Sequence, residues 1–354
     1  MAARGHEVRV LGSAATRPAA ERAGCRAEAY RRAPEPDTRI PFERQAAAMM
    51  ATAAGLELAS DVQDTIASDR PALAIVDCML PAGLAAARVT GTPAASLAHF
   101  LYGVARRHMA ARGGSWTTDL DTLRATCGAI GLEPPASGLD AWEDCDLVLV
   151  SAPRWLDAEI DYPARVTHAG PLGIERAAEA SDSGPPEGPP TVLLSFSTSA
   201  MDGQAALAQR VCDAVGETGV RALLTLGPAI DGRELRVPAG VAVSAWGDHD
   251  SLLPSSAAVI GHAGLGTTLR SLAHGVPLVL LPLGRDQALN AARVEELGAG
   301  IALAPDAVPA AIRAALGRVL KEPAFAAAAR AAAARIAADE PDRRAGEALE
   351  GCFR

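Results

Sequence analysis

Residues 261–269 read Gly-His-Ala-Gly-Leu-Gly-Thr-Thr-Leu and directly follow the apolar run Ala-Val-Ile. An apolar strand, a glycine-rich turn and a helix in this order are typical of a βαβ unit. Glycines let the backbone approach a ligand closely, and a helix beginning near Gly266 presents unpaired N–H groups and its positive dipole end. The stretch therefore predicts a diphosphate site, to which His262 adds a hydrogen bond. The glycines alone fit a tight turn without a ligand equally well, and Leu269 stands where the dinucleotide fingerprint needs its third glycine.

Outward from this stretch, short apolar runs alternate with longer Ala-rich, helix-forming segments. Nearly continuous apolar strands suit parallel sheets covered on both faces, so the whole chain is predicted to be α/β. The predicted strands are Glu7–Leu11, Leu73–Asp77, Pro93–Leu97, Asp146–Ser151, Thr191–Phe196, Arg221–Leu226, Val241–Ala245, Ala258–Gly261, Pro277–Leu281 and Gly300–Leu303.

A polar, Pro/Gly-dense segment without periodicity occupies residues 175–190, which is typical of an exposed linker. It predicts an N-terminal domain over 1–174 and a C-terminal domain over 191–354. A ligand site is expected in a cleft between two such α/β halves.

Composition excludes several classes of function. The net charge of -9 disfavours nucleic acid and anionic membrane as main partners, and the single lysine, Lys321, excludes Schiff-base enzymes and P-loop NTPases. None of the six cysteines forms a C-x-x-C pair, so free thiols in a reducing compartment are expected. No apolar stretch approaches the ~20 residues of a membrane span, and no secretory leader is present at the start, so we expect a cytoplasmic protein.

Two features flank the glycine-rich turn. Upstream, Trp246 ends a predicted strand and is suited to stacking on a flat base. Downstream, Asp286 and Gln287 lie at a helix start, where the pair can grip sugar hydroxyls; Asp286 can alternatively cap that helix.

Together these residues resemble the donor-binding signature of the glycosyltransferase superfamily that includes UDP-glucuronosyl- and UDP-glucosyltransferases and actinobacterial antibiotic glycosyltransferases. The family pattern is an aromatic residue, Leu-Leu-Pro, His-x-Gly-x-Gly-Thr, Gly-Val-Pro and Asp-Gln-x-x-Asn-Ala. Residues 246–291 supply all of these in order. The resemblance implies the GT-B fold, with two Rossmann-like doubly wound domains facing across a cleft.

The resemblance also implies a role for each matching residue. The nucleobase packs on Trp246, and the sugar is bound by Asp286 and Gln287. The phosphates are held by Ser197, Thr198, His262, Gly264, Gly266 and Thr267. The family uses no metal and no cofactor beyond the nucleotide-sugar co-substrate, and the sequence offers no metal-ligand cluster of recognised spacing.

The catalytic base is the gap in this pattern. The family's base histidine follows the first strand of the N-terminal domain, whereas this sequence opens on what resembles the end of the first helix. We therefore expect an N-terminal domain truncated at its start, by a start assigned too far downstream rather than by true loss. His99 is a candidate for the acceptor pocket wall. Asp77 ends an apolar strand and either orients a catalytic histidine or caps the next helix.

The resemblance implies an inverting glycosyltransferase that moves a deoxysugar or other sugar from a dTDP- or UDP-sugar to a hydroxyl of a hydrophobic natural-product aglycone, as in antibiotic biosynthesis. Two alternatives stay open: a non-catalytic donor-binding or auxiliary protein, and a nucleotide-sugar epimerase of the same fold. The sequence leaves open whether the chain forms a homodimer.

Overall fold

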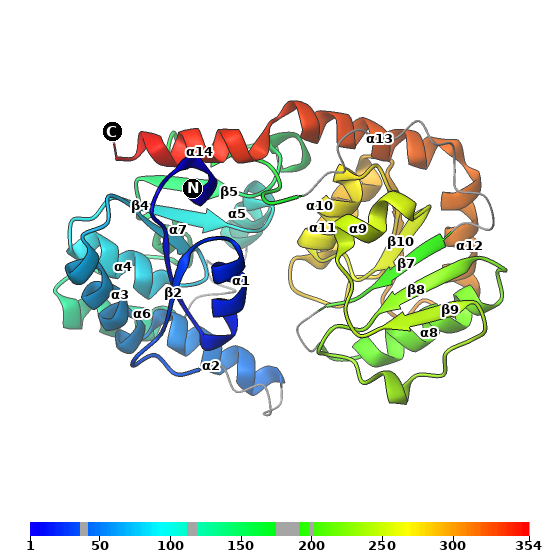
Figure 1. Cartoon of the computed structure of the whole chain (residues 1–354), viewed down its shortest axis with the longest axis horizontal. Helices are drawn as coiled ribbons and strands as arrows, with labels where there is room; N and C mark the ends of the chain where they lie inside the picture. The colour runs from blue at the N-terminus through cyan, green and yellow to red at the C-terminus, as the bar shows by residue number, and fades with distance from the viewer. Residues whose placement is uncertain (36–41, 112–118, 175–190, 198–200, 354) are drawn as a thin grey trace. The chain divides into compact units, whose positions relative to one another are not determined.

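The computed structural model describes residues 1–35, 42–111, 119–174, 191–197 and 201–353. The chain divides into two compact units, each with its own parallel sheets (Figure 1). This confirms the predicted α/β class. Within the described ranges, no helix combines the length and the apolar character that crossing a membrane requires.

The unit boundaries differ from the predicted domains at the C-terminus. The first unit contains Met1–Ala169 together with Asp342–Arg354, and the second contains Gly170–Pro341. The last helix joins the first unit because Glu350 accepts two hydrogen bonds from the Arg4 guanidinium, at 2.7 and 3.0 Å. The prediction that 191–354 form one domain is therefore wrong for its final residues. The predicted linker at 175–190 lies outside the described residues.

The first unit carries two separate parallel sheets. One pairs β1 with β2, and the other has the order β3-β4-β5-β6. Within the described residues, β1 and β3 thus each form a sheet edge, and Ile75 on β3 is exposed. The strands are β1 (Arg9–Gly12), β2 (Arg26–Ala29), β3 (Ala74–Asp77), β4 (Ala94–Ala98), β5 (Leu147–Val150) and β6 (Val166–His168).

Ala-rich helices pack closely beside these sheets. Small side chains such as Ala59 and Ala86 allow α3 and α4 to approach each other, and Leu58 and Leu123 fill the space between the helices. The helices are α1 (Arg17–Arg22), α2 (Phe42–Ala54), α3 (Leu56–Asp69), α4 (Pro81–Val89), α5 (Tyr102–Ala111), α6 (Leu120–Ile130), α7 (Gly138–Glu143) and α14 (Pro341–Gly351).

The second unit is built on one six-stranded parallel sheet with the order β12-β11-β10-β7-β8-β9. Chain order reverses between the neighbouring strands β7 and β10, which are the first and fourth strands of this sheet along the sequence. This is the topology of a Rossmann-like domain. The strands are β7 (Thr191–Ser195), β8 (Arg221–Thr225), β9 (Val241–Ser244), β10 (Ala258–Gly261), β11 (Leu278–Leu280) and β12 (Gly300–Ala302).

Helices cover both faces of this sheet. On one face, Leu207 and Val211 of α8 and Leu316 of α12 pack with strand residues such as Leu194 and Ile260 in a single apolar core. Figure 1 shows α10 and α11 on the other side of the sheet, where α10 also contacts α13. The helices are α8 (Gln204–Gly216), α9 (His249–Leu252), α10 (Leu265–Ala273), α11 (Gln287–Glu296), α12 (Pro309–Lys321) and α13 (Pro323–Ala338).

Candidate functional site

The point where chain order reverses in the second sheet places β7 and β10 side by side. Gly261 at the end of β10 is in register with Ser195 at the end of β7. A Cβ at position 261 would lie 2.6 Å from the Ser195 carbonyl oxygen, so only glycine permits this approach. In open α/β sheets, ligands bind outside the carboxyl ends of the strands at such a reversal. The glycine-rich turn predicted to bind a diphosphate lies there.

The turn after β10 leads directly into α10. Ala263 adopts a left-handed backbone conformation with φ 65°, and Gly264 occupies the N-cap position of the helix. No side chain caps α10 at this position, and its first turn holds no acidic residue to neutralise the dipole. The first-turn N–H groups at Gly266 and Thr267 therefore present positive partial charge that suits an anion. The helix begins at Leu265, one residue before the predicted position.

His262 directly follows β10, two residues before the N-cap of α10, and is only 6% exposed. A Cβ on Gly264 would lie 2.5 Å from the Nε2 atom of His262, so the glycine makes room for the ring. The buried Nδ1 atom has no hydrogen bond of normal geometry within the described chain. Burial lowers the pKa of His262 to about 4. The imidazole is therefore neutral near pH 7 and carries one N–H to donate.

The lowered pKa of His262 predicts acid sensitivity. Because the unfolded histidine binds a proton near pH 6.5 and the folded one only near pH 4, stability falls as the pH drops through this window. The pKa difference corresponds to a loss of about 2 kcal/mol between pH 8 and pH 5. Urea unfolding of the wild type and His262→Asn at both pH values measures it. An equal loss in the two proteins would contradict the prediction.

Asp286 and Gln287, at the start of α11, do not form a simple helix cap. Asp286 stands at the N-cap position but makes no capping hydrogen bond; its Oδ2 accepts from the Asn290 amide at 2.9 Å. Gln287 is buried, and its Oε1 accepts from the backbone N–H groups of Leu283 and Gly284 at 2.7 and 3.2 Å. Sugar binding by Asp286 and Gln287 stays a prediction.

Asn290 is a positioning residue to which the sequence analysis gave no role. It is 1% exposed, and its amide donates to the Ala263 carbonyl at 3.0 Å as well as to Asp286. This side chain ties the left-handed residue of the glycine-rich turn to the start of α11. Its place in the Asp-Gln-x-x-Asn-Ala pattern was the signal that could have identified it.

The other predicted donor residues are placed as follows. Trp246 follows β9 and is 67% exposed, which leaves its indole face open for stacking. Ser197 follows β7 and is buried, and its carbonyl accepts from Gln204 Nε2 at 2.8 Å. Thr198 lies outside the described residues.

His249 is a second histidine near the switch point that sequence reasoning passed over as part of a spacer. Its Nε2 lies 3.1 Å from Ser195 Oγ at the end of β7. Burial, and next the charge of Arg270, lower the pKa of His249. Two histidines with lowered pKa values thus lie close to Ser195, one following β10 and one on α9.

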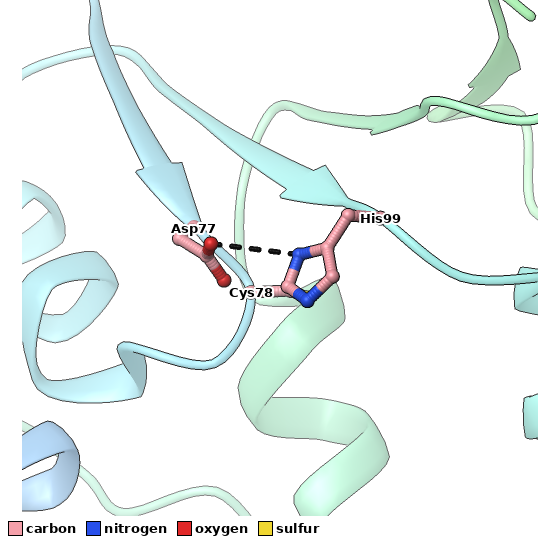
Figure 2. Close-up of side chains that lie close together, drawn as sticks. All are labelled: Asp77, Cys78 and His99. Atoms are coloured by element: carbon pink, nitrogen blue, oxygen red, sulfur yellow. Dashed lines mark ion pairs between the residues drawn. The ribbon is translucent and has the colours of Figure 1, made fainter. Parts of the chain in front are cut away.

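In the first unit, the structure brings Asp77 and His99 together (Figure 2). The Nδ1 of His99 lies 3.5 Å from Oδ2 of Asp77. One ring nitrogen of His99, one carboxylate oxygen of Asp77 and the Cys78 sulfur all lie within 4.8 Å of one another. Asp77 does not cap the next helix, because α4 begins at Pro81 after an N-cap at Leu80 that makes no side-chain hydrogen bond. The acceptor-pocket role of His99 stays a prediction.

One family model matches part of the chain. Residues 209–348 match the model of the Erythromycin biosynthesis protein CIII-like, C-terminal domain. An elloramycin glycosyltransferase from Streptomyces olivaceus is 44% identical over 110 residues, which are 30% of this chain and 27% of that protein. A 3-alpha-mycarosylerythronolide B desosaminyl transferase from Saccharopolyspora erythraea is 35% identical over 136 residues, or 37% of this chain and 30% of that protein.

The matches to these two curated relatives thus span less than a third of each relative's length. Solved structures match along the whole chain. The glycotransferase of kitacinnamycin has a TM-score of 0.78 at 21% identity and covers 100% of this chain and 93% of its own. A glycosyltransferase solved in complex with dTDP has a TM-score of 0.71 at 20% identity, covering 99% and 93%. These structures confirm the predicted GT-B fold.

Proposed function

We propose that this chain, which joins an EryCIII-like C-terminal domain to the fold of the GT-B glycosyltransferases, is itself a glycosyltransferase that uses a nucleoside diphosphate sugar. One observation carries the proposal. The open N-terminus of α10 and the buried, neutral His262 meet at the strand-order reversal of the second sheet. Both supply N–H groups, and together they suit the two phosphates of a nucleoside diphosphate.

The relatives support a proposal for the donor and the acceptor. One structural neighbour was solved with dTDP, and the two matched relatives are named an elloramycin glycosyltransferase and a desosaminyl transferase. We therefore assign a dTDP- or UDP-sugar, with a deoxysugar favoured, as donor and a hydrophobic natural-product hydroxyl as acceptor. Trp246 would stack on the base, and Asp286 and Gln287 would bind the sugar.

In the reaction, the acceptor oxygen attacks the anomeric carbon from the face opposite the leaving group, and the configuration inverts. The nucleoside diphosphate leaves with the bonding electron pair, so negative charge grows on its phosphate oxygens. The helix start at Gly264–Thr267 and the N–H of His262 stabilise that charge. We assign this task to helix and histidine in place of a metal ion.

We place the reaction in the cytoplasm. All six cysteines are free thiols in the structure, and three of them, Cys78, Cys127 and Cys212, are buried. Free thiols in this number suit a reducing compartment. This agrees with the free thiols expected from the sequence.

A turnover assay separates transfer from epimerisation. The chain is incubated with dTDP-glucose or UDP-glucose, with and without benzyl alcohol or para-nitrophenol as acceptor. We expect release of the nucleoside diphosphate to depend on the acceptor and to yield the glycoside. Conversion of the donor sugar to its epimer without acceptor would replace the proposal with the epimerase alternative, and absence of any turnover would contradict both.

A further inference from the structure

Three side chains that can ligate a metal meet at the carboxyl ends of two neighbouring strands in the first unit. Asp77 is the last residue of β3, Cys78 follows it, and His99 directly follows β4, which pairs with β3 in parallel. A ring nitrogen, a carboxylate oxygen and the sulfur lie within 4.8 Å of one another (Figure 2). Among the residues that the structure describes, no other group of three or more histidines, cysteines and acidic residues brings its ligand atoms together in this way.

The separation between Asp77 and His99 fits two ligands of one metal ion better than it fits a hydrogen bond. Oδ2 of Asp77 lies 3.5 Å from Nδ1 of His99, whereas N–H···O hydrogen bonds span about 2.7–3.2 Å. A tetrahedral Zn²⁺ holds a histidine nitrogen and a carboxylate oxygen at about 2.0–2.2 Å each, which places those two atoms about 3.3–3.5 Å apart. A Zn²⁺ ion between these side chains therefore requires almost no change in their separation.

Backbone hydrogen bonds hold Asp77 and Cys78 in place. Oδ1 of Asp77 accepts from the N–H of Met79 at 2.8 Å, which leaves Oδ2 as the oxygen that faces His99. The N–H of Cys78 donates to the Leu97 carbonyl at 3.1 Å and so ties the turn after β3 to β4. Because these ligands are positioned before a metal binds, the entropic cost of binding is lowered.

The cluster combines two accessible ligands with one sulfur that is shielded from solvent. The side chains of His99 and Asp77 are 50% and 43% exposed, whereas Cys78 is fully buried. Burial raises the pKa of the Cys78 thiol well above its usual value, so the thiol keeps its proton when no metal is bound. A divalent cation that reaches the sulfur displaces this proton, because a coordinating thiol is deprotonated outright.

The set of ligand atoms selects the kind of metal. Sulfur, imidazole nitrogen and carboxylate oxygen are the three ligand types of Zn²⁺ sites, whereas Mg²⁺ and Ca²⁺ require oxygen ligands. Three protein ligands leave the fourth tetrahedral position to water.

We propose that Asp77, Cys78 and His99 bind one Zn²⁺ ion, with water as the fourth ligand. The site lies wholly within the first unit, and the proposal does not rest on the proposed glycosyltransferase function. The expectation of a protein without a metal site concerned the donor diphosphate. The sequence analysis did not identify this cluster, because its ligands come from two strands and match no motif spacing.

Cobalt substitution tests for the sulfur ligand directly. The whole chain is freed of metal with EDTA and titrated with Co²⁺, whose bond to a thiolate produces a charge-transfer band in the near ultraviolet. We expect the band to saturate at one Co²⁺ per chain and to disappear when Zn²⁺ is added, because tetrahedral thiolate sites favour Zn²⁺. Excess Mg²⁺ should leave the band unchanged, since Mg²⁺ prefers oxygen ligands.

Single substitutions test which residues are the ligands. By calorimetry, Cys78→Ala and His99→Gln are each expected to weaken Zn²⁺ binding by about 100-fold or more, the loss of one of three protein ligands. His99 is half-exposed, so His99→Gln keeps the test valid if the buried Cys78→Ala does not fold. Cys25→Ser and His108→Gln are the matched controls, because they remove a thiol and an imidazole elsewhere in the first unit. Both should bind Zn²⁺ as the wild type does.

Three results would overturn the proposal. The first is a wild-type chain without saturable Zn²⁺ binding. The second is a Co²⁺ band that stays unchanged in a folded Cys78→Ala, or Zn²⁺ affinity that stays unchanged in His99→Gln. The third is a loss in Cys25→Ser or His108→Gln as large as that in the ligand variants, because the ion would then be bound elsewhere. None of these results bears on nucleotide binding by the second unit.

Discussion

Gly264→Ala is expected to weaken dTDP binding by about 100-fold, because it displaces a charge-stabilising N–H donor and crowds the helix start. The added Cβ would lie 2.5 Å from Nε2 and 2.9 Å from Cε1 of His262. The ring is buried, so it moves only by disturbing the turn after β10. Gly264 has φ −61°, which alanine adopts without strain, so the effect comes from the ring and not from the backbone. Isothermal calorimetry measures it.

Two other glycines make this result specific. Gly317 lies in α12 of the same unit with open space at its Cβ position, and Gly317→Ala should leave dTDP binding unchanged while raising stability by about 0.5–1 kcal/mol. A Cβ on Gly266 also meets no protein atom within 4 Å, so Gly266→Ala should weaken binding only through the bound phosphate. If Gly264→Ala binds dTDP as tightly as the wild type, the assignment of His262 to the donor site is wrong.

Asp157→Ala is expected to lower the free energy of unfolding by about 3–5 kcal/mol, the usual result of removing one partner from a buried ionic cluster. Asp157 is 1% exposed and accepts from the backbone N–H groups of Gly103, Val104 and Ala158 at 2.8, 3.0 and 2.8 Å. It also lies 2.9 Å from Nε2 of the buried His168. Loss of the carboxylate leaves the first turn of α5 and the end of β6 without this acceptor. Urea unfolding near pH 7 measures the change.

The Asp157 carboxylate also makes the free energy of unfolding depend on pH in the acid range. Burial alone would raise the pKa of Asp157, but hydrogen bonds from His168 and from backbone N–H groups outweigh it and lower the pKa. The stabilisation is therefore present above the unfolded value of about 3.9 and is lost as the pH falls through the lower folded value. The stability difference between wild type and Asp157→Ala should shrink in this window. Asp121→Ala, at an exposed position on α6, should leave both the free energy of unfolding near pH 7 and its dependence on acid pH unchanged. A loss of stability in Asp121→Ala as large as that in Asp157→Ala would contradict the assignment.

The second unit was largely predictable because its signals are local. Strand β10 has the predicted bounds, Ala258–Gly261, since an apolar run ends there on a glycine that packs against β7. Strand β2 was missed because Arg-Ala-Glu-Ala lacks the β-branched and aromatic residues on which strand prediction depends. The return of α14 to the first unit depends on the Arg4–Glu350 pair, which joins residues 346 positions apart and leaves no local trace.

In the candidate site too, the features with local sequence signals were predicted and those that depend on contacts between distant residues were not. The glycine-rich turn and His262 were identified from a contiguous motif, whereas their burial and the tie through Asn290 depend on packing between β10 and α11. Asp77 and His99 were each singled out, but their pairing was not predicted. Both follow predicted strands, and the meeting of neighbouring carboxyl ends at one sheet edge was the signal that could have joined them.

Calorimetric titration of the wild type and His262→Ala with dTDP and with UDP tests the central claim most directly. We predict saturable binding of at least one nucleotide by the wild type and an affinity about 10- to 100-fold lower in the variant, the loss of one hydrogen bond to a charged ligand. Circular dichroism of both proteins confirms that the fold is retained. A folded wild type that binds neither nucleotide, or a variant that binds as tightly as the wild type, would contradict the assignment of the donor site.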